Sequence, residues 1–126
     1  MDKTILLVDD EPDILKMLEV RLKKSGYNII MAPTGEECLQ KAEKEHPDLV
    51  LLDILLPGIS GFEVARQLKA KASTKDIPVI IVTALIGKDV ENKGLERGAD
   101  YFISKPFDPE ELLAKIKTIL GKDDKK

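Results

Sequence analysis

Carboxylate, hydroxyl and ammonium side chains directly follow four short apolar runs of this sequence. They are Asp9 and Asp10, then Asp53, Thr83 and Lys105. An unbroken run of apolar residues bounded by turn signals is typical of a strand buried on both faces of a parallel sheet. The carboxyl ends of parallel strands lie at one edge of the sheet, where ligands bind in open α/β folds. We therefore expect the five side chains to converge on one crevice.

Carboxylates that converge in a partly buried crevice repel one another. Two unit charges 4 Å apart repel by about 4 kcal/mol at an effective dielectric constant near 20. Either one carboxylate is protonated or a cation lies among them. Oxygen ligands without His or Cys favour a hard ion such as Mg²⁺, which takes one or two carboxylates together with waters and phosphate oxygens. The acidic cluster is therefore interpreted as a magnesium site.

The remaining two side chains suit a phosphoryl group. Lys105 brings a positive charge and Thr83 a hydroxyl, the kinds of group that hold phosphoryl oxygens. The carboxylate of Asp53 can act as a nucleophile and form an acyl-phosphate. Each residue alone has an ordinary explanation, such as a helix N-terminus, a turn, β propensity or a solvated charge. Their expected convergence favours phosphoryl transfer to Asp53.

Other candidate sites have weaker support. His46, the only histidine, precedes Pro47 at an expected helix end, where it complements the helix dipole. Cys38, the only cysteine, falls at an inward helical position and is interpreted as a core residue, so there is no disulfide framework. No glycine-rich phosphate loop of the Walker or dinucleotide type is present, and no Ser or Cys nucleophile has a histidine partner.

The composition sets the broad class. The chain has 126 residues, 43% hydrophobic and 34% charged, which fits one soluble domain. A net charge of -3 argues against direct binding to nucleic acid. No apolar run approaches the roughly 18 residues of a membrane span, and no signal peptide is evident. We expect a cytoplasmic protein without membrane insertion.

Strand-like and helix-like segments alternate five times along the chain. The expected strands are 4–8, 27–32, 49–52, 77–82 and 100–104. Proline positions and capping-box spacings predict helices that begin near Pro12, Thr34, Ser60, Gly87 and Asp108. The alternation predicts an α/β fold with a parallel sheet and helices on both faces.

Two segments near the C-terminus carry further expectations. The segment 87–97 has few apolar residues, which predicts a loosely held helix. The last helix is expected to end at Gly121, so that one domain covers residues 1–121 and a disordered charged tail covers 122–126.

The chain resembles the response-regulator receiver domains of bacterial two-component signalling over residues 3–120. The resemblance rests on Ile-Leu-Leu-Val-Asp-Asp-Glu (5–11), Leu-Leu-Asp-Ile-Leu-Leu-Pro-Gly-Ile-Ser-Gly (51–61), Val-Thr-Ala (82–84) and Gly-Ala-Asp-Tyr-Phe-Ile-Ser-Lys-Pro-Phe (98–107). It implies a flavodoxin-like five-stranded parallel sheet of order 2-1-3-4-5. It also implies a phospho-accepting switch that catalyses only its own phosphorylation and dephosphorylation.

The resemblance assigns roles at the phosphorylation site. Asp53 accepts the phosphoryl group from a sensor histidine kinase, or from a small phosphodonor. Asp10 and Asp53 ligate Mg²⁺, or Mn²⁺ in its place, together with the backbone carbonyl of Leu55, while Asp9 acts through a bound water. Lys105 pairs with the carboxylate and then with the phosphoryl group, and its bond to Pro106 is expected to be cis.

The resemblance also assigns a switch. Thr83 moves to hydrogen-bond the phosphoryl group, and Phe102 turns inward behind it, where many relatives have Tyr. Tyr101 is expected on the opposite face. The output surface is the fourth helix, fifth strand and fifth helix. Leu55 and Leu85 are hypothesised to restrict water and lengthen the lifetime of the acyl-phosphate.

Several alternatives stay open at this point. A haloacid-dehalogenase-like phosphatase places a second Asp two residues after its nucleophile, but this chain has Leu55 there and no cap domain. A scaffold that works without phosphorylation usually lacks the acidic pair, the acceptor or the lysine, and all are present here. The phosphoryl group either stays on this chain or is exchanged with a histidine phosphotransfer protein. The domain either stands alone or belongs to a longer protein.

Overall fold

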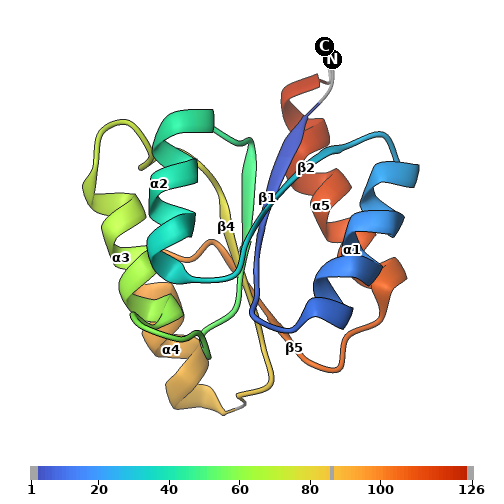
Figure 1. The fold of residues 1–126 in the computed structure, drawn as a ribbon. Helices are drawn as coiled ribbons and strands as arrows, with labels where there is room; N and C mark the ends of the chain where they lie inside the picture. Colours follow the sequence, from blue (N-terminus) through green and yellow to red (C-terminus); the bar gives the residue numbers. More distant parts are fainter. Residues whose placement is uncertain (1–2, 86, 125–126) are drawn as a thin grey trace.

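The computed structural model describes the backbone of residues 3–85 and 87–124. A five-stranded parallel sheet has the order β2-β1-β3-β4-β5, which confirms the expected topology (Figure 1). The strands are β1 (Thr4–Val8), β2 (Asn28–Ala32), β3 (Leu49–Leu52), β4 (Val79–Thr83) and β5 (Tyr101–Ser104). The helices are α1 (Pro12–Lys24), α2 (Gly35–Glu45), α3 (Gly61–Ala70), α4 (Lys88–Glu96) and α5 (Pro109–Asp124).

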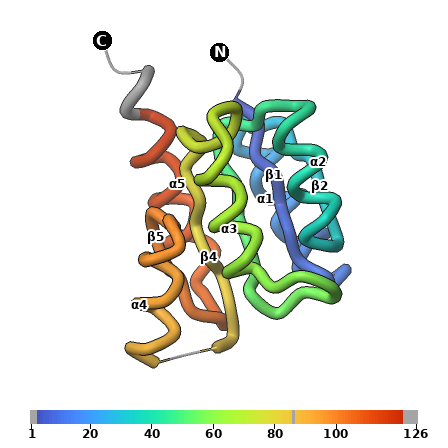
Figure 2. The backbone as a smooth tube through the Cα atoms, turned by 90° about the vertical axis from the view of Figure 1, so that its left-hand side faces the viewer, coloured from blue at the N-terminus to red at the C-terminus, as the bar shows by residue number. Residues whose placement is uncertain are grey.

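The sheet separates two helix layers. In Figure 1, α1 and α5 lie on one side of the sheet and α2, α3 and α4 on the other, and the second layer faces the reader in Figure 2. Side chains of β1 alternate between the layers: Ile5 and Leu7 pack with α1 and α5, whereas Leu6 and Val8 pack with α2 and α3. Both faces of the central strands are therefore buried, which explains their unbroken apolar runs.

The helix boundaries follow the expected local chemistry. The Thr34 hydroxyl accepts a hydrogen bond from the Glu37 backbone N–H at 3.2 Å. The Ser60 hydroxyl accepts one from the Glu63 N–H at 3.3 Å. Each bond satisfies a donor that the first turn of a helix leaves free. At the other end of α2, His46 adopts a left-handed conformation with φ of 51° and ends the helix.

Two boundaries differ from expectation by more than one residue. The strand β4 begins at Val79 rather than at residue 77, because Pro78 has no N–H to donate and the Ile77 carbonyl accepts a hydrogen bond from the Lys69 ammonium at 2.8 Å. The helix α5 continues through Gly121 to Asp124. Glycine ends a helix by adopting positive φ, as Gly26 does here with φ of 100°, and Gly121 does not adopt it. Of the predicted tail 122–126, residues 125–126 lie outside the described part.

Helix α4 is held by little buried surface. Gly94 is its only buried residue within the described part of the chain. The Gly94 backbone lies so close to the sheet that a Cβ placed there would be 2.9 Å from the Ile81 side chain and 3.5 Å from the Phe102 ring. None of the helices among the described residues combines the length and apolar character needed to cross a membrane.

Candidate functional site

The candidate site forms where β1, β3 and β5 end at the same edge of the sheet. Asp9 follows β1 and Asp53 follows β3, and the two strands are paired up to their last residues, Val8 and Leu52. The Asp53 N–H donates to the Val8 carbonyl at 3.0 Å, which continues the ladder by one step. The Asp9 and Asp53 residues are 6% and 4% exposed. Two acidic residues are therefore fixed side by side and nearly buried.

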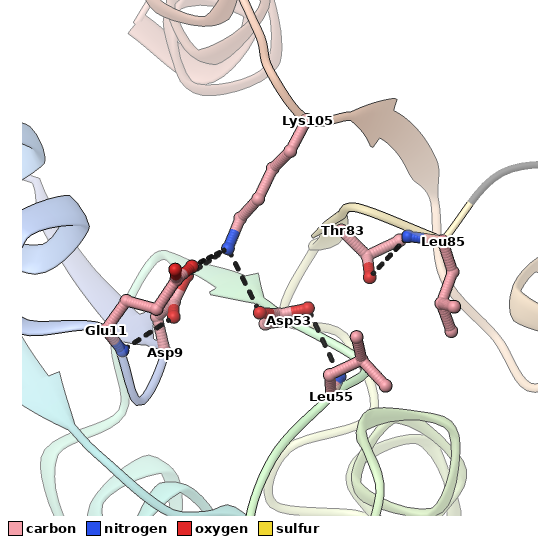
Figure 3. Close-up of polar contacts among 7 residues, drawn as sticks. All are labelled: Asp9, Glu11, Asp53, Leu55, Thr83, Leu85 and Lys105. Carbon is pink, nitrogen blue, oxygen red and sulfur yellow. Dashed lines mark hydrogen bonds and ion pairs between the residues drawn. The ribbon is translucent and has the colours of Figure 1, made fainter.

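Lys105 supplies the positive charge of this cluster. Its Nζ lies 2.8 Å from Asp9 Oδ2, 3.1 Å from Asp53 Oδ2 and 2.9 Å from Glu11 Oε1 (Figure 3). The Lys105 side chain is 10% exposed, so this is a nearly buried network and not a surface ion pair. The sequence predicted the first two contacts as a convergence of strand ends. It gave Glu11 no role beyond helix N-terminal chemistry.

Backbone donors occupy the other two carboxylate oxygens. The Glu11 N–H donates to Asp9 Oδ1 at 3.0 Å, and the Leu55 N–H donates to Asp53 Oδ1 at 3.2 Å. All four oxygens of Asp9 and Asp53 therefore have a donor. The backbone thereby fixes the orientation of both carboxylates.

Burial and hydrogen bonding act in opposite directions on the pKa values here. Burial raises the pKa of Asp9 above its ordinary value, although the hydrogen bonds from Lys105 and the Glu11 N–H oppose this effect. For Lys105, burial alone would lower the pKa, but the hydrogen bonds to Asp9, Glu11 and Asp53 outweigh it and the pKa is raised. Lys105 is therefore held in its charged form at neutral pH.

The acidic cluster has the donor set of a hard cation. One carboxylate oxygen from each of Asp9, Asp10 and Asp53 can be chosen so that all three lie within 4.8 Å of one another. Asp10, which follows Asp9 in the chain, is exposed to solvent. Three converging oxygen donors without nitrogen or sulfur fit Mg²⁺ or Mn²⁺. The backbone carbonyl of Leu55 as a further ligand, and a water between Asp9 and the ion, stay predictions.

Thr83 reaches the same edge from β4. It is fully buried, and its hydroxyl oxygen accepts a hydrogen bond from the Leu85 N–H at 3.3 Å. In Figure 3 Thr83 and Lys105 lie on either side of Asp53. The hydroxyl oxygen is therefore engaged by the β4–α4 loop in this structure, and its contact with a phosphoryl group stays a prediction.

The aromatic pair of β5 points to opposite layers. Phe102 is half-buried and packs with Ile54, Ile81 and other residues beside α4. Tyr101 packs in the other layer, where the Lys115 ammonium lies 4.8 Å from its ring centroid. The opposite orientation of Tyr101 is the one expected, whereas the inward turn of Phe102 behind Thr83 stays a prediction. The Lys105–Pro106 bond is cis, as expected.

Gly61 keeps the loop after Asp53 in place. Its N–H donates to the Ile54 carbonyl at 2.9 Å, which draws the start of α3 against the end of β3. A Cβ at Gly61 would lie 2.2 Å from the Asp53 carbonyl oxygen and 2.6 Å from the Ile54 Cα. Backbone atoms cannot yield as a flexible side chain does. In the sequence, Gly61 is recognisable only as a member of a motif, because a close approach of two backbone segments leaves no local pattern.

Comparisons with known proteins place the chain in one family. The model of the response regulator receiver domain family matches residues 5–117. The alkaline phosphatase synthesis transcriptional regulatory protein PhoP of Bacillus subtilis is 44% identical over 124 residues, which is 98% of this chain and 51% of that protein. The phosphate regulon transcriptional regulatory protein PhoB of Pseudomonas aeruginosa is 47% identical over 118 residues, covering 94% of this chain and 52% of that protein. The chain thus spans about half the length of these relatives.

Solved structures show the same fold. A CheY-like response regulator receiver domain protein from Methanospirillum hungatei has a TM-score of 0.91 and 35% identity, with 98% of each chain covered. The BeF3-activated N-terminal receiver domain of Klebsiella pneumoniae RstA has a TM-score of 0.87 and 32% identity, covering 93% of this chain and 97% of that one. With the family match over most of its length, this chain belongs to the response-regulator receiver domains of two-component signalling.

Proposed function

We propose that this chain is a phosphorylation switch in which Asp53 accepts a phosphoryl group. The donor is the phosphohistidine of a sensor histidine kinase or of a histidine phosphotransfer protein, or a small phosphodonor. The observation that carries the proposal is the nearly buried Asp53 carboxylate, held 3.1 Å from the Lys105 ammonium beside two further aspartates. A structural ion pair would not need three converging carboxylates at one strand edge.

The chemistry is an exchange of one bond to phosphorus for another. A carboxylate oxygen of Asp53 attacks phosphorus and forms the acyl-phosphate, while the P–N bond of phosphohistidine breaks and its electron pair stays on the imidazole. Lys105 offsets the negative charge of the phosphoryl oxygens, and the Thr83 hydroxyl donates to one of them once it has turned. Mg²⁺ held by Asp10, Asp53 and the Leu55 carbonyl, with Asp9 acting through a bound water, would supply further charge neutralisation.

The output follows from the contact that Thr83 gives up. When its hydroxyl turns to a phosphoryl oxygen, the 3.3 Å contact with the Leu85 N–H is lost and the β4–α4 loop is released. Phe102 then fills the vacated space. Since Gly94 is the only described buried residue of α4, moving this helix disrupts little packing. The α4–β5–α5 surface is thereby the part whose shape, and affinity for a protein partner, depends on phosphorylation.

Other assignments have less support. Leu55 stands where a phosphatase of the haloacid-dehalogenase kind would need an Asp, so we propose no turnover of other substrates. A scaffold independent of phosphorylation would not need the intact Asp53–Lys105 pair.

PhoP and PhoB are named as transcriptional regulatory proteins, and this chain matches only half of each. We propose that the chain itself contacts proteins, the kinase and an output partner, in the cytoplasm, and binds neither nucleic acid nor membrane directly.

Intact-mass measurement after incubation with acetyl phosphate and Mg²⁺ tests the proposal. We expect the mass to increase by one phosphoryl group, and we expect no increase with Asp53→Asn or with EDTA. Asp89→Asn, which neutralises an exposed carboxylate on α4, is the matched control and should react as the wild type does. Modification that persists in Asp53→Asn would contradict the assignment of the acceptor. Absence of modification by acetyl phosphate and by a phosphorylated histidine kinase would refute the proposed switch.

A further inference from the structure

Glu11 lies at the site without a role in the chemistry proposed above. Its backbone N–H donates to Asp9 Oδ1 at 3.0 Å, and its side-chain Oε1 accepts from Lys105 Nζ at 2.9 Å. The Glu11 side chain is 59% exposed, whereas those of Asp9 and Asp53 are 8% and 5% exposed. Lys105 is therefore bound on its inner side by two buried carboxylates and on its outer side by one that faces solvent (Figure 3).

The inner carboxylates are also the ones that a metal ion requires. Lys105 occupies Asp9 Oδ2 and Asp53 Oδ2, and backbone N–H groups occupy the other two oxygens. A divalent cation bound by Asp9, Asp10 and Asp53 would have to share these oxygens with the ammonium. Two positive charges bound to the same carboxylates repel each other. Binding of the cation is therefore favoured if the ammonium can shift toward another negative partner.

We infer that Glu11 is that partner, a positioning residue that keeps the Lys105 ammonium at the site while Asp9 and Asp53 bind a divalent cation. The inference rests on the proposed function, because it assumes a cation at the three aspartates. Without Glu11, the ammonium has only the inner carboxylates as partners and competes with the cation for them. Glu11 thus raises the affinity for the cation through Lys105, and not as a ligand.

The direct Coulomb attraction between Glu11 and the cation has to be distinguished from the effect of Glu11 through Lys105. Any carboxylate near the site attracts a cation, so the loss of Glu11 would weaken binding somewhat even without a role for Lys105. Asp13 provides the comparison, since it is an exposed carboxylate in the first turn of α1 and Lys105 does not bind it. Lys105→Met provides the second comparison, since it removes the competing ammonium.

The experiment measures binding of Mn²⁺, from the electron paramagnetic resonance signal of the free ion. The proteins are the wild type, Glu11→Gln, Asp13→Asn, Lys105→Met, and the double variant that combines Glu11→Gln with Lys105→Met. Circular dichroism checks that each is folded. We expect Glu11→Gln to weaken binding at least about threefold, and Asp13→Asn less than about 1.5-fold. In the background of Lys105→Met, adding Glu11→Gln should have no more effect than Asp13→Asn has in the wild type.

Equal loss with Glu11→Gln and Asp13→Asn would overturn the inference, as would the same loss in both backgrounds, because Glu11 would then act only as a nearby charge. If Lys105→Met does not fold, the comparison between Glu11→Gln and Asp13→Asn decides alone. Asp53→Asn distinguishes a failure of the inference about Glu11 from a failure of the proposed function. Mn²⁺ binding that does not depend on Asp53, or no binding by the wild type, would refute the metal site and with it the proposed function.

Discussion

Replacing Lys105 with Met tests whether this residue is the counter-charge of the cluster. Methionine keeps much of the length and apolar stem of lysine but leaves Asp9 and Asp53 facing each other without a cation. Removing one partner from a buried ionic network destabilises more than losing an exposed ion pair, because an uncompensated charge stays buried. The variant should fold with a markedly smaller free energy of unfolding when no metal is present.

The size of the effect follows from the geometry. Oxygens of the two carboxylates can lie within 4.8 Å of each other. At that distance and an effective dielectric constant near 20, two charges repel by about 3.5 kcal/mol. Protonation of Asp9, whose pKa burial already raises, limits this cost. We expect a loss of about 2–4 kcal/mol at pH 7.5, a large part of the 5–15 kcal/mol typical of a domain.

The pH dependence has a definite sign. In the variant, the Asp9 pKa rises further, so between the ordinary pKa of 3.8 and the raised value the folded chain holds a proton that the unfolded chain lacks. Stability relative to the wild type therefore falls as pH increases through that window, and the deficit is smaller at pH 5 than at pH 7.5. In the wild type, Lys105 has a raised pKa, so its contribution is present at both values and is lost only as pH rises through that pKa.

Urea denaturation in EDTA, at pH 5 and pH 7.5, measures the loss of stability and its pH dependence. The midpoint of Lys105→Met should be lower than that of the wild type by about 1–2 M at pH 7.5. Lys71→Met is the matched control, because Lys71 pairs with Glu43 in an exposed contact at 3.2 Å worth at most about 1 kcal/mol. Equal midpoints for the two variants, or a deficit of Lys105→Met that is larger at pH 5, would show that the two carboxylates do not interact as calculated.

Three further predictions concern the fold. Gly61→Ala should lower the free energy of unfolding by at least about 2 kcal/mol, because its Cβ would overlap backbone atoms after β3, whereas helical Gly121→Ala has open space and should raise it by about 0.5–1 kcal/mol. Urea titration compares the two, and similar effects would contradict the packing argument. Burial raises the pKa of Cys38 to about 12, so only about one thiol in ten thousand is ionised at pH 8. A thiol reagent should therefore react fast only in denaturant, and rapid labelling of the folded protein would contradict the burial of this thiol. Thr34→Ala should cost about 1 kcal/mol through loss of the bond from the Glu37 N–H, and Thr34→Ser should restore most of it in thermal unfolding.

The sequence was sufficient to predict where the strand ends meet. Asp9, Asp53 and Lys105 come together because parallel strands end at one edge, a consequence of topology that does not depend on side-chain rotamers. It was not sufficient to predict that Glu11 binds Lys105, since this depends on which rotamer a solvent-facing side chain adopts. The end of α5 was also missed, because a glycine in a solvent-facing turn costs only about 1 kcal/mol and does not by itself end a helix.

The site combines parts that are held rigidly with one that is not. Asp53 follows β3, whose four residues are all buried, and its carboxylate is fixed by the Leu55 N–H and the Lys105 ammonium. The α4 segment buries only Gly94 among its described residues. In the proposed switch, α4 would therefore change position with little loss of buried side-chain packing. A ligand shifts a conformational equilibrium only by its differential affinity for the two states. In the proposed switch, a weakly held helix would therefore lower the differential affinity that a single phosphoryl group has to supply.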